Sequence, residues 1–201
     1  MVFLDIVATG GRLLKNGTFS QPQKLGRLHF ELRCDLVPVA CANFLALIRG
    51  DKPQGEDGVR YHLKGVRLHR VVKNRLFQSG DLMDKKGECS RSIYNNGGLF
   101  RDENFIFRHA GQGCISMCNR GPDTNGSLFQ VTFMELPELD ERHVVFGCIA
   151  EIRESVPCLN RIDMLGTPSG EPLEDIRIAD CGIAYPTATS KKKTVSTAQD
   201  D

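Results

Sequence analysis

The stretch VRLHRVVKNRLFQSGD, residues 66–81, gathers side chains that could do chemistry on a sheet surface. His69 and Arg70 are adjacent within an apolar pattern typical of a strand, and Gln78 follows in the next strand-like run. An Arg guanidinium stays protonated and offers several N–H donors in a rigid fork, and a Gln amide both donates and accepts hydrogen bonds. Taken alone, the segment favours an ordinary exposed strand arginine.

The composition narrows the class of protein. The chain has 201 residues, enough for one domain with a sizeable core. Its 26 basic and 25 acidic residues nearly balance, which argues against a nucleic-acid binder. No segment approaches the roughly 20 apolar residues of a membrane span, and the acidic start MVFLDIVATG is unlike a signal peptide. We therefore expect a cytoplasmic protein with neither a membrane nor a nucleic acid as partner.

Cysteines could indicate metal or redox chemistry. There are eight, none of them in a C-x-x-C pair, so we expect no metal site. Without an export signal they are interpreted as reduced thiols, several of them buried as small apolar groups. Cys114 and Cys118 share the parity of one strand, and core packing is favoured over a redox role for them.

Alternating apolar residues separated by Gly and Asn signals predict a protein that is mainly β. Leu28, Phe30 and Leu32, for example, alternate with polar residues. The expected strands are 2–7, 25–33, 64–72, 75–78, 113–118, 127–133, 144–149 and 175–183. Strands at both chain ends suggest a closed sheet, because closure removes the edges that invite aggregation.

Only two helices are expected, one at each open end of the closed sheet. Pro38 and Gly50 suit the start and end of a helix over residues 38–49. Pro157 suits the first turn of a second helix over residues 156–165.

The remaining segments predict one domain over residues 1–185, with long loops at 8–24 and 51–62. The stretch 186–201 has almost no large apolar side chain and is expected to be a disordered tail.

Five blocks of sequence resemble the cyclophilins, the cyclophilin-type peptidyl-prolyl cis-trans isomerases. They are LHRVV…FQSGD, SIY…FRDENF, GCISMCNRGPDTNGSLF, LDERHVVFG and IADCG, in the family's order. The resemblance implies a closed eight-stranded antiparallel β-barrel capped by two α-helices, and activity on X-Pro bonds of peptides and proteins. Proline-containing peptides or proteins are then the expected partners.

The chemistry implied by the resemblance needs no metal, cofactor or nucleophile. Rotation about an X-Pro bond crosses a barrier of about 18–20 kcal/mol. At the twisted geometry the proline nitrogen gains a lone pair, so a donor aimed at it stabilises the transition state more than either planar form. By resemblance, Arg70 is that donor.

The resemblance also assigns roles to other residues. Gln78 would orient Arg70 or bind the peptide backbone, Asn119 would bind the main chain, and His143 would lie beside the proline ring. The expected catalytic set is His69, Arg70, Gln78, Asn119 and His143. The expected substrate-binding set is Arg75, Leu76, Cys118, Arg120, Leu128, Gln130 and Leu139.

Several positions depart from the family pattern. They are Arg75, Arg120, Leu128, Gln130 and Glu138. Arg75 and Gln130 stand where pocket phenylalanines are usual, and each loss forfeits up to about 1.5–3 kcal/mol of apolar burial. Because a one-residue slip would expose Phe129, we expect Phe129 to face the interior and Gln130 to face the groove.

These departures leave two functions open. The first is an isomerase with weakened or narrowed activity. The second is an inactive or weakly active cyclophilin-like subunit of a larger protein assembly. The stretch GVRYHLKGVRLHR, residues 58–70, resembles divergent members of the family, some of them from cilia and flagella. The cilium or flagellum is therefore the alternative compartment.

Overall fold

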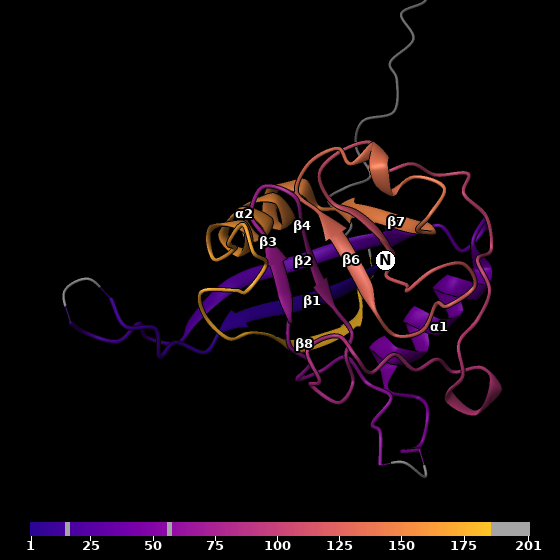
Figure 1. Ribbon diagram of the computed structural model, residues 1–201, viewed down its shortest axis with the longest axis horizontal. Coiled ribbons are helices and arrows are strands. Elements are labelled where there is room, and N and C mark those ends of the chain that lie inside the picture. The colour runs from indigo at the N-terminus through magenta and orange to yellow at the C-terminus, as the bar shows by residue number, and fades with distance from the viewer. Residues whose placement is uncertain (15–16, 56–57, 186–201) are drawn as a thin grey trace, which may run out of the picture.

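The computed structural model describes residues 1–14, 17–55 and 58–185, and it contains one eight-stranded antiparallel sheet (Figure 1). The strands are β1 Val2–Ala8, β2 Gln23–Leu32, β3 Arg70–Val72, β4 Leu76–Ser79, β5 Cys114–Met117, β6 Phe129–Thr132, β7 Val145–Ala150 and β8 Ile176–Ile183. Their order in the sheet is β3-β4-β6-β5-β7-β2-β1-β8. The predicted mainly-β fold with eight antiparallel strands is confirmed.

The N-terminal strand, β1, lies between β2 and β8, and its residues alternate between two environments. Val2, Leu4 and Ile6 are buried, and the residues between them are half-buried. The register of β1 shifts at Ile6/Val7 against β2 and at Asp5/Ile6 against β8. Such irregularities increase local twist and bend the strand, which helps the sheet to curl.

The predicted closure of the barrel is wrong in one respect, because the curled sheet is not fully closed. Its two terminal strands, β3 and β8, form no continuous ladder. Instead, the segment before β3 meets β8 at a bridge between Arg67 and Arg177. Leu68 N–H donates to Ile176 O at 2.8 Å beside this bridge. The expected strand 64–72 is shortened to β3 because this segment turns from β8 towards β4.

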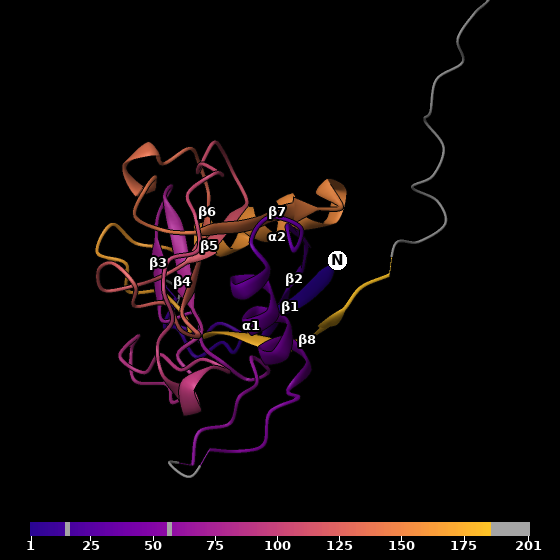
Figure 2. The same ribbon diagram turned by 90° about the vertical axis from the view of Figure 1, so that its right-hand side faces the viewer.

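The two helices lie on either side of β1 and β2 (Figures 1 and 2). α1, Pro38–Arg49, has the predicted bounds, with Pro38 in its first turn and Gly50 as a left-handed C-cap at φ 69°. The Gly50 N–H donates to Ala46 O at 2.9 Å, which satisfies one of the orphan carbonyls at the helix end.

The second helix starts earlier than predicted. α2 spans Ile152–Met164, so Pro157 lies inside the helix and not in its first turn. The extra turn forms because the Glu151 carbonyl accepts hydrogen bonds from Glu154 N at 2.9 Å and Ser155 N at 3.0 Å. The Ser155 hydroxyl also donates to Ala150 O at 2.6 Å. Among the described helices, none is long and apolar enough to cross a membrane.

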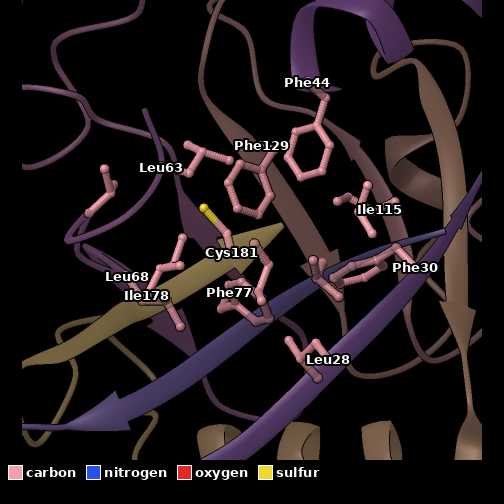
Figure 3. Packing of buried hydrophobic residues seen from close by; sticks show 14 of the residues in the cluster. Leu28, Phe30, Phe44, Leu63, Leu68, Phe77, Ile115, Phe129, Ile178 and Cys181 are labelled. Carbon is pink, nitrogen blue, oxygen red and sulfur yellow. The ribbon is translucent and has the colours of Figure 1, made fainter. Parts of the chain in front are cut away.

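A cluster of buried aliphatic and aromatic side chains fills the space inside the curled sheet (Figure 3). Phe129 is fully buried, as predicted, and its ring centroid lies 5.2 Å from that of Phe44 and 6.5 Å from that of Phe77. These rings meet edge to face, the arrangement that aromatic quadrupoles favour. Phe44 comes from α1 and Phe77 from β4, so this cluster joins a helix to the strands that carry the candidate site.

Replacement of Phe129 tests this account of the core. We expect Phe129→Ala to lower the free energy of unfolding by about 3–5 kcal/mol, because the lost ring leaves a cavity between α1 and β4. Phe19→Ala is the matched control, because Phe19 is 61% exposed and its loss should change stability by less than about 0.5 kcal/mol. Urea denaturation measures both. Equal destabilisation by the two changes would contradict this assignment.

Candidate functional site

Sheet register brings the predicted chemistry-bearing residues into one row. Arg70 on β3 is opposite Gln78 on β4, and Gln78 is opposite Gln130 on β6. Gln130 is in turn opposite Ser116 on β5. Because residues directly opposite share a face of the sheet, four polar side chains cross four strands in a line.

Arg70 is exposed and lines an open cavity of about 420 Å³. The other predicted site residues that line it are His69, Gln78, Cys118, Asn119, Arg120 and Leu128. Arg70 has no carboxylate partner among the described residues, so its guanidinium is free to meet a ligand. The predicted donor therefore faces an open space.

The loop after α2 holds the Arg70 side chain in place. Gly170, at φ +90°, packs so closely that a Cβ there would lie 2.8 Å from Arg70 Nε. The Val71 N–H donates to Gly170 O at 2.8 Å, which ties this loop to β3. Only a residue without a side chain leaves room for the arginine stem.

His69 packs against the loop that forms one wall of the cavity, so its role there is structural support and not hydrogen-bond donation. A Cβ at Gly87 would lie 2.7 Å from His69 Nε2, so the imidazole packs directly under the loop that contains Gly87. That loop is held by Asp81, whose carboxylate accepts from Gly87 N at 2.7 Å and Met83 N at 3.0 Å. Burial lowers the pKa of His69, which keeps the ring neutral near pH 7.

Gln130 lies beneath Gln78 and not in the open cavity. Gln130 is 1% exposed, and both the oxygen and the nitrogen of its side-chain amide are hydrogen-bonded. Gln78 Nε2 donates to Gln130 Oε1 at 3.2 Å, and Gln130 Nε2 donates to Ser116 Oγ at 3.2 Å. Gln130 was expected to face the groove. It shares a face of the sheet with Gln78, but it is buried and does not line the open cavity.

The hydrogen-bonded row continues into residues that sequence reasoning missed. His109 Nε2 lies 2.9 Å from Ser116 Oγ, and His109 Nδ1 lies 2.8 Å from Asp140 Oδ1. Since Ser116 accepts from Gln130, its own proton is available to His109 Nε2, and the remaining ring proton is on Nδ1 beside Asp140. We call this run from Gln78 through Gln130, Ser116 and His109 to Asp140 the polar chain.

The order of Asp140, His109 and Ser116 is that of a nucleophilic triad, but burial excludes that chemistry. Ser116 is 0% exposed and His109 is 1% exposed, so no substrate reaches the hydroxyl. The signal in the sequence was Ser116 itself, a polar residue between Ile115 and Met117 in an apolar strand. A buried hydroxyl of this kind requires a partner.

The charge states of the polar chain follow from its surroundings. Burial lowers the pKa of His109 and outweighs the opposing effect of the hydrogen bond that His109 donates to Asp140. Burial by itself would raise the pKa of the Asp140 carboxyl. The hydrogen bonds that Asp140 accepts from His109 N and Nδ1 outweigh this effect, so the pKa is lowered. Near pH 7 the polar chain therefore contains the neutral imidazole of His109 and the carboxylate of Asp140.

His143 and Asn119 line a second cavity of about 530 Å³, together with Phe105 and Pro122. The His143 Nδ1 atom lies 3.1 Å from Met117 O, and Asn119 Nδ2 donates to Arg142 O at 2.9 Å. Asn119 lines both cavities, so the two predicted halves of the groove adjoin at this residue.

Neither of these two cavities is lined by Arg75, Leu76 or Leu139, which were also predicted to bind substrate. Arg75 and Glu138 form an ion pair, each about half exposed, so their charges largely cancel. Leu76 is 7% exposed and Leu139 is half-buried. Burial raises the pKa of Cys118 to about 11, so this thiol stays protonated near pH 7. Among the described residues, no group of three or more His, Cys, Asp or Glu could hold a metal ion.

Comparison with known proteins agrees with this fold. Residues 18–183 match the family model described as cyclophilin type peptidyl-prolyl cis-trans isomerase/CLD. The chain belongs to the cyclophilin-type peptidyl-prolyl cis-trans isomerase family.

Curated relatives share this domain within longer proteins. The chain is 42% identical over 163 residues to the NK-tumor recognition proteins of Mus musculus and Homo sapiens, covering 80% of this chain and 11% of each relative. It is 39% identical over 161 residues to the "Probable inactive peptidyl-prolyl cis-trans isomerase-like 6" of Mus musculus, covering 80% of this chain and 50% of that protein. The chain thus spans at most about half the length of these relatives.

Four histidines predict that mild acid destabilises the fold. Their pKa values lie below the ordinary value of 6.5, with burial as the largest cause in each case; they are His62, His69, His109 and His143. Below pH 6.5 the unfolded chain therefore binds more protons than the folded chain, so the free energy of unfolding falls as the pH decreases towards the folded values. Urea denaturation at about pH 7.5 and about pH 5.5 measures this.

The variant His109→Gln separates the contribution of this residue from those of the other three histidines. It should be less stable than the parent at about pH 7.5, because the polar chain loses Asp140 as a partner, and its stability should change less with pH. A parent protein equally stable at both pH values would contradict the prediction.

Proposed function

We propose that this chain catalyses cis-trans isomerisation of X-Pro bonds in a narrowed set of peptides or proteins. The observation that carries the proposal is the open position of Arg70, exposed at a cavity of about 420 Å³ without a carboxylate partner among the described residues. A peptide lying across β3 and β4 can bring its proline nitrogen to this guanidinium. Membership of the cyclophilin-type family supports the same chemistry.

In this proposal the catalytic work is hydrogen bonding to a distorted amide. Arg70 donates to the pyramidal proline nitrogen, which has a lone pair only near the transition state. Gln78 is fixed by its bond to Gln130, so its Oε1 is the atom left to accept from Arg70 or a peptide N–H. His143 and Asn119 would bind the peptide on the side of the second cavity.

Narrowed specificity is supported by what surrounds the expected proline pocket. Gln130, whose amide is hydrogen-bonded to both Gln78 and Ser116, stands where the family usually has a pocket phenylalanine. Arg75 stands at a second such position and is ion-paired with Glu138. Two lost aromatic contacts would weaken proline binding by roughly one to three powers of ten. Leu76 and Leu139 would offset part of that loss.

A second function, a weakly active or inactive interaction subunit, is favoured by a different observation. Residues 9–14 and 17–22 extend away from the barrel (Figure 1). On this arm Leu13 is 64% exposed, Leu14 37% and Phe19 61%, and a bridge pairs Leu13 with Phe19. Exposed apolar side chains on a projecting segment suit contact with another protein. One relative is itself named probable inactive. In this alternative the partner would be a ciliary or flagellar assembly.

Removal of the guanidinium distinguishes the two functions. We expect Arg70→Ala to lower kcat/KM for X-Pro peptides by roughly 10²–10³-fold, because the donor to the proline nitrogen is lost. Arg153→Ala, an exposed arginine on α2, is the matched control and should retain parental activity. A protease-coupled assay measures both. A parent rate equal to that of buffer would contradict the isomerase and favour the subunit.

Charge on the substrate provides a second test. Lys86 and Arg120 line the Arg70 cavity, and neither has a carboxylate partner among the described residues, whereas Arg67 is paired with Asp175 at 3.0 Å. We therefore expect peptides with Glu before the proline to bind about 3- to 10-fold more tightly than Gln peptides at low salt, with a smaller difference in high salt.

Calorimetry with the two peptides measures this preference in the parent protein and in Lys86→Ala/Arg120→Ala. The double variant should bind the Glu and Gln peptides about equally. Equal affinities in the parent at low salt would show that these cations do not select the substrate.

A further inference from the structure

Two cysteines occupy directly opposite positions on neighbouring strands. Cys114 on β5 pairs with Cys148 on β7 in the sheet register. Both are free thiols, with Cys148 exposed and Cys114 half-buried. Their neighbours Ile115 and Ile149 are buried, so the two thiols share the outer face of the sheet.

The hydrogen-bond pattern determines how close the two cysteines are. Ile149 N–H donates to Gly113 O at 2.9 Å, which is the bond that flanks a non-hydrogen-bonded pair at Cys114 and Cys148. The Cys114 N–H points the other way, to Thr132 Oγ1 at 3.0 Å on β6. Non-hydrogen-bonded pairs have Cα atoms about 4.5 Å apart and the closest side chains in a sheet, within the range that a disulfide spans.

The other cysteines are less suited to pairing. Cys41, Cys89, Cys158 and Cys181 are buried, so a reagent in solution does not reach their thiols. Cys34 is exposed, but its neighbour Cys41 is 0% exposed and lies against Phe146 O at 3.6 Å. Within the described part of the chain, the β5–β7 pair alone combines opposite positions with access to a reagent.

We propose that Cys114 and Cys148 form a reversible cross-strand disulfide when the protein meets a low-molecular-weight disulfide. The thiolate of one cysteine attacks a sulfur of the reagent, and one small thiol leaves. The second cysteine then attacks the protein-bound sulfur, and the second small thiol leaves. Two protein S–H groups and one external S–S bond become one protein S–S bond and two external S–H groups.

Formation of this bond changes few existing contacts. The Cys114 thiol would give up a weak hydrogen bond to Arg108 O, which spans 3.8 Å, and turn towards β7. The new bond would join β5 to β7 next to the register shift at Ile115/Ser116. Oxidation would therefore brace the strand that carries Ser116, the central member of the polar chain.

Oxidised glutathione is the probe for the test, applied to the whole chain and followed by non-reducing digestion and mass spectrometry. We expect a linked peptide that contains Cys114 and Cys148. We also expect a rise in Tm of roughly 5–15 °C that dithiothreitol reverses. Cys148→Ser should abolish both, and the control Cys34→Ser should leave both unchanged.

Three results would overturn the proposal: glutathione adducts at Cys114 or Cys148 without a linked peptide, a link through Cys34, or no reaction. The mass spectrum of the parent protein decides between these results even if a variant folds poorly. Because no step uses the groove, the test stands apart from isomerase activity.

Discussion

The site depends on one requirement, that the buried Gln130 amide be hydrogen-bonded. An unsatisfied amide costs more than most single contacts contribute, so the donors and acceptors around Gln130 are constrained together. Gln78 supplies the donor from β4, and Ser116 supplies the acceptor from β5. The orientation of Gln78 beside Arg70 is therefore linked, through Gln130 and Ser116, to His109 and Asp140.

Charge is arranged differently around the Arg75–Glu138 pair and around Arg70. Around the expected proline pocket, Arg75 and Glu138 pair and cancel. Around Arg70 the cations Lys86 and Arg120 remain without carboxylate partners among the described residues. An uncharged proline ring and an anionic flanking side chain would thus meet different local fields, although the whole chain is nearly neutral at +1.

Much of the fold could be predicted from the sequence because its signals are local. Alternation identified β1 and β2, the Pro38 and Gly50 signals gave the bounds of α1, and the side of Phe129 followed from period two. The predicted start of α2 was wrong because it was placed from Pro157 alone. The first turn is stabilised by hydrogen bonds that Glu151 and Ser155 make, which the position of a proline does not indicate. The polar chain was missed because its members are distant in sequence and meet only when β5 and β6 pair.

The edge position of β3 has a consequence for how firmly the groove is held. β3 has three residues, pairs with β4 on one side, and is followed on its other side by the loop at Thr167 and Gly170. That loop is hydrogen-bonded to the outer edge of β3: the Val71 N–H donates to Gly170 O at 2.8 Å, and the Thr167 N–H donates to Val71 O at 3.1 Å. The position of Arg70 is thus coupled to a loop and not to a further strand, so a change in residues 167–170 would move the donor without unfolding the aromatic core.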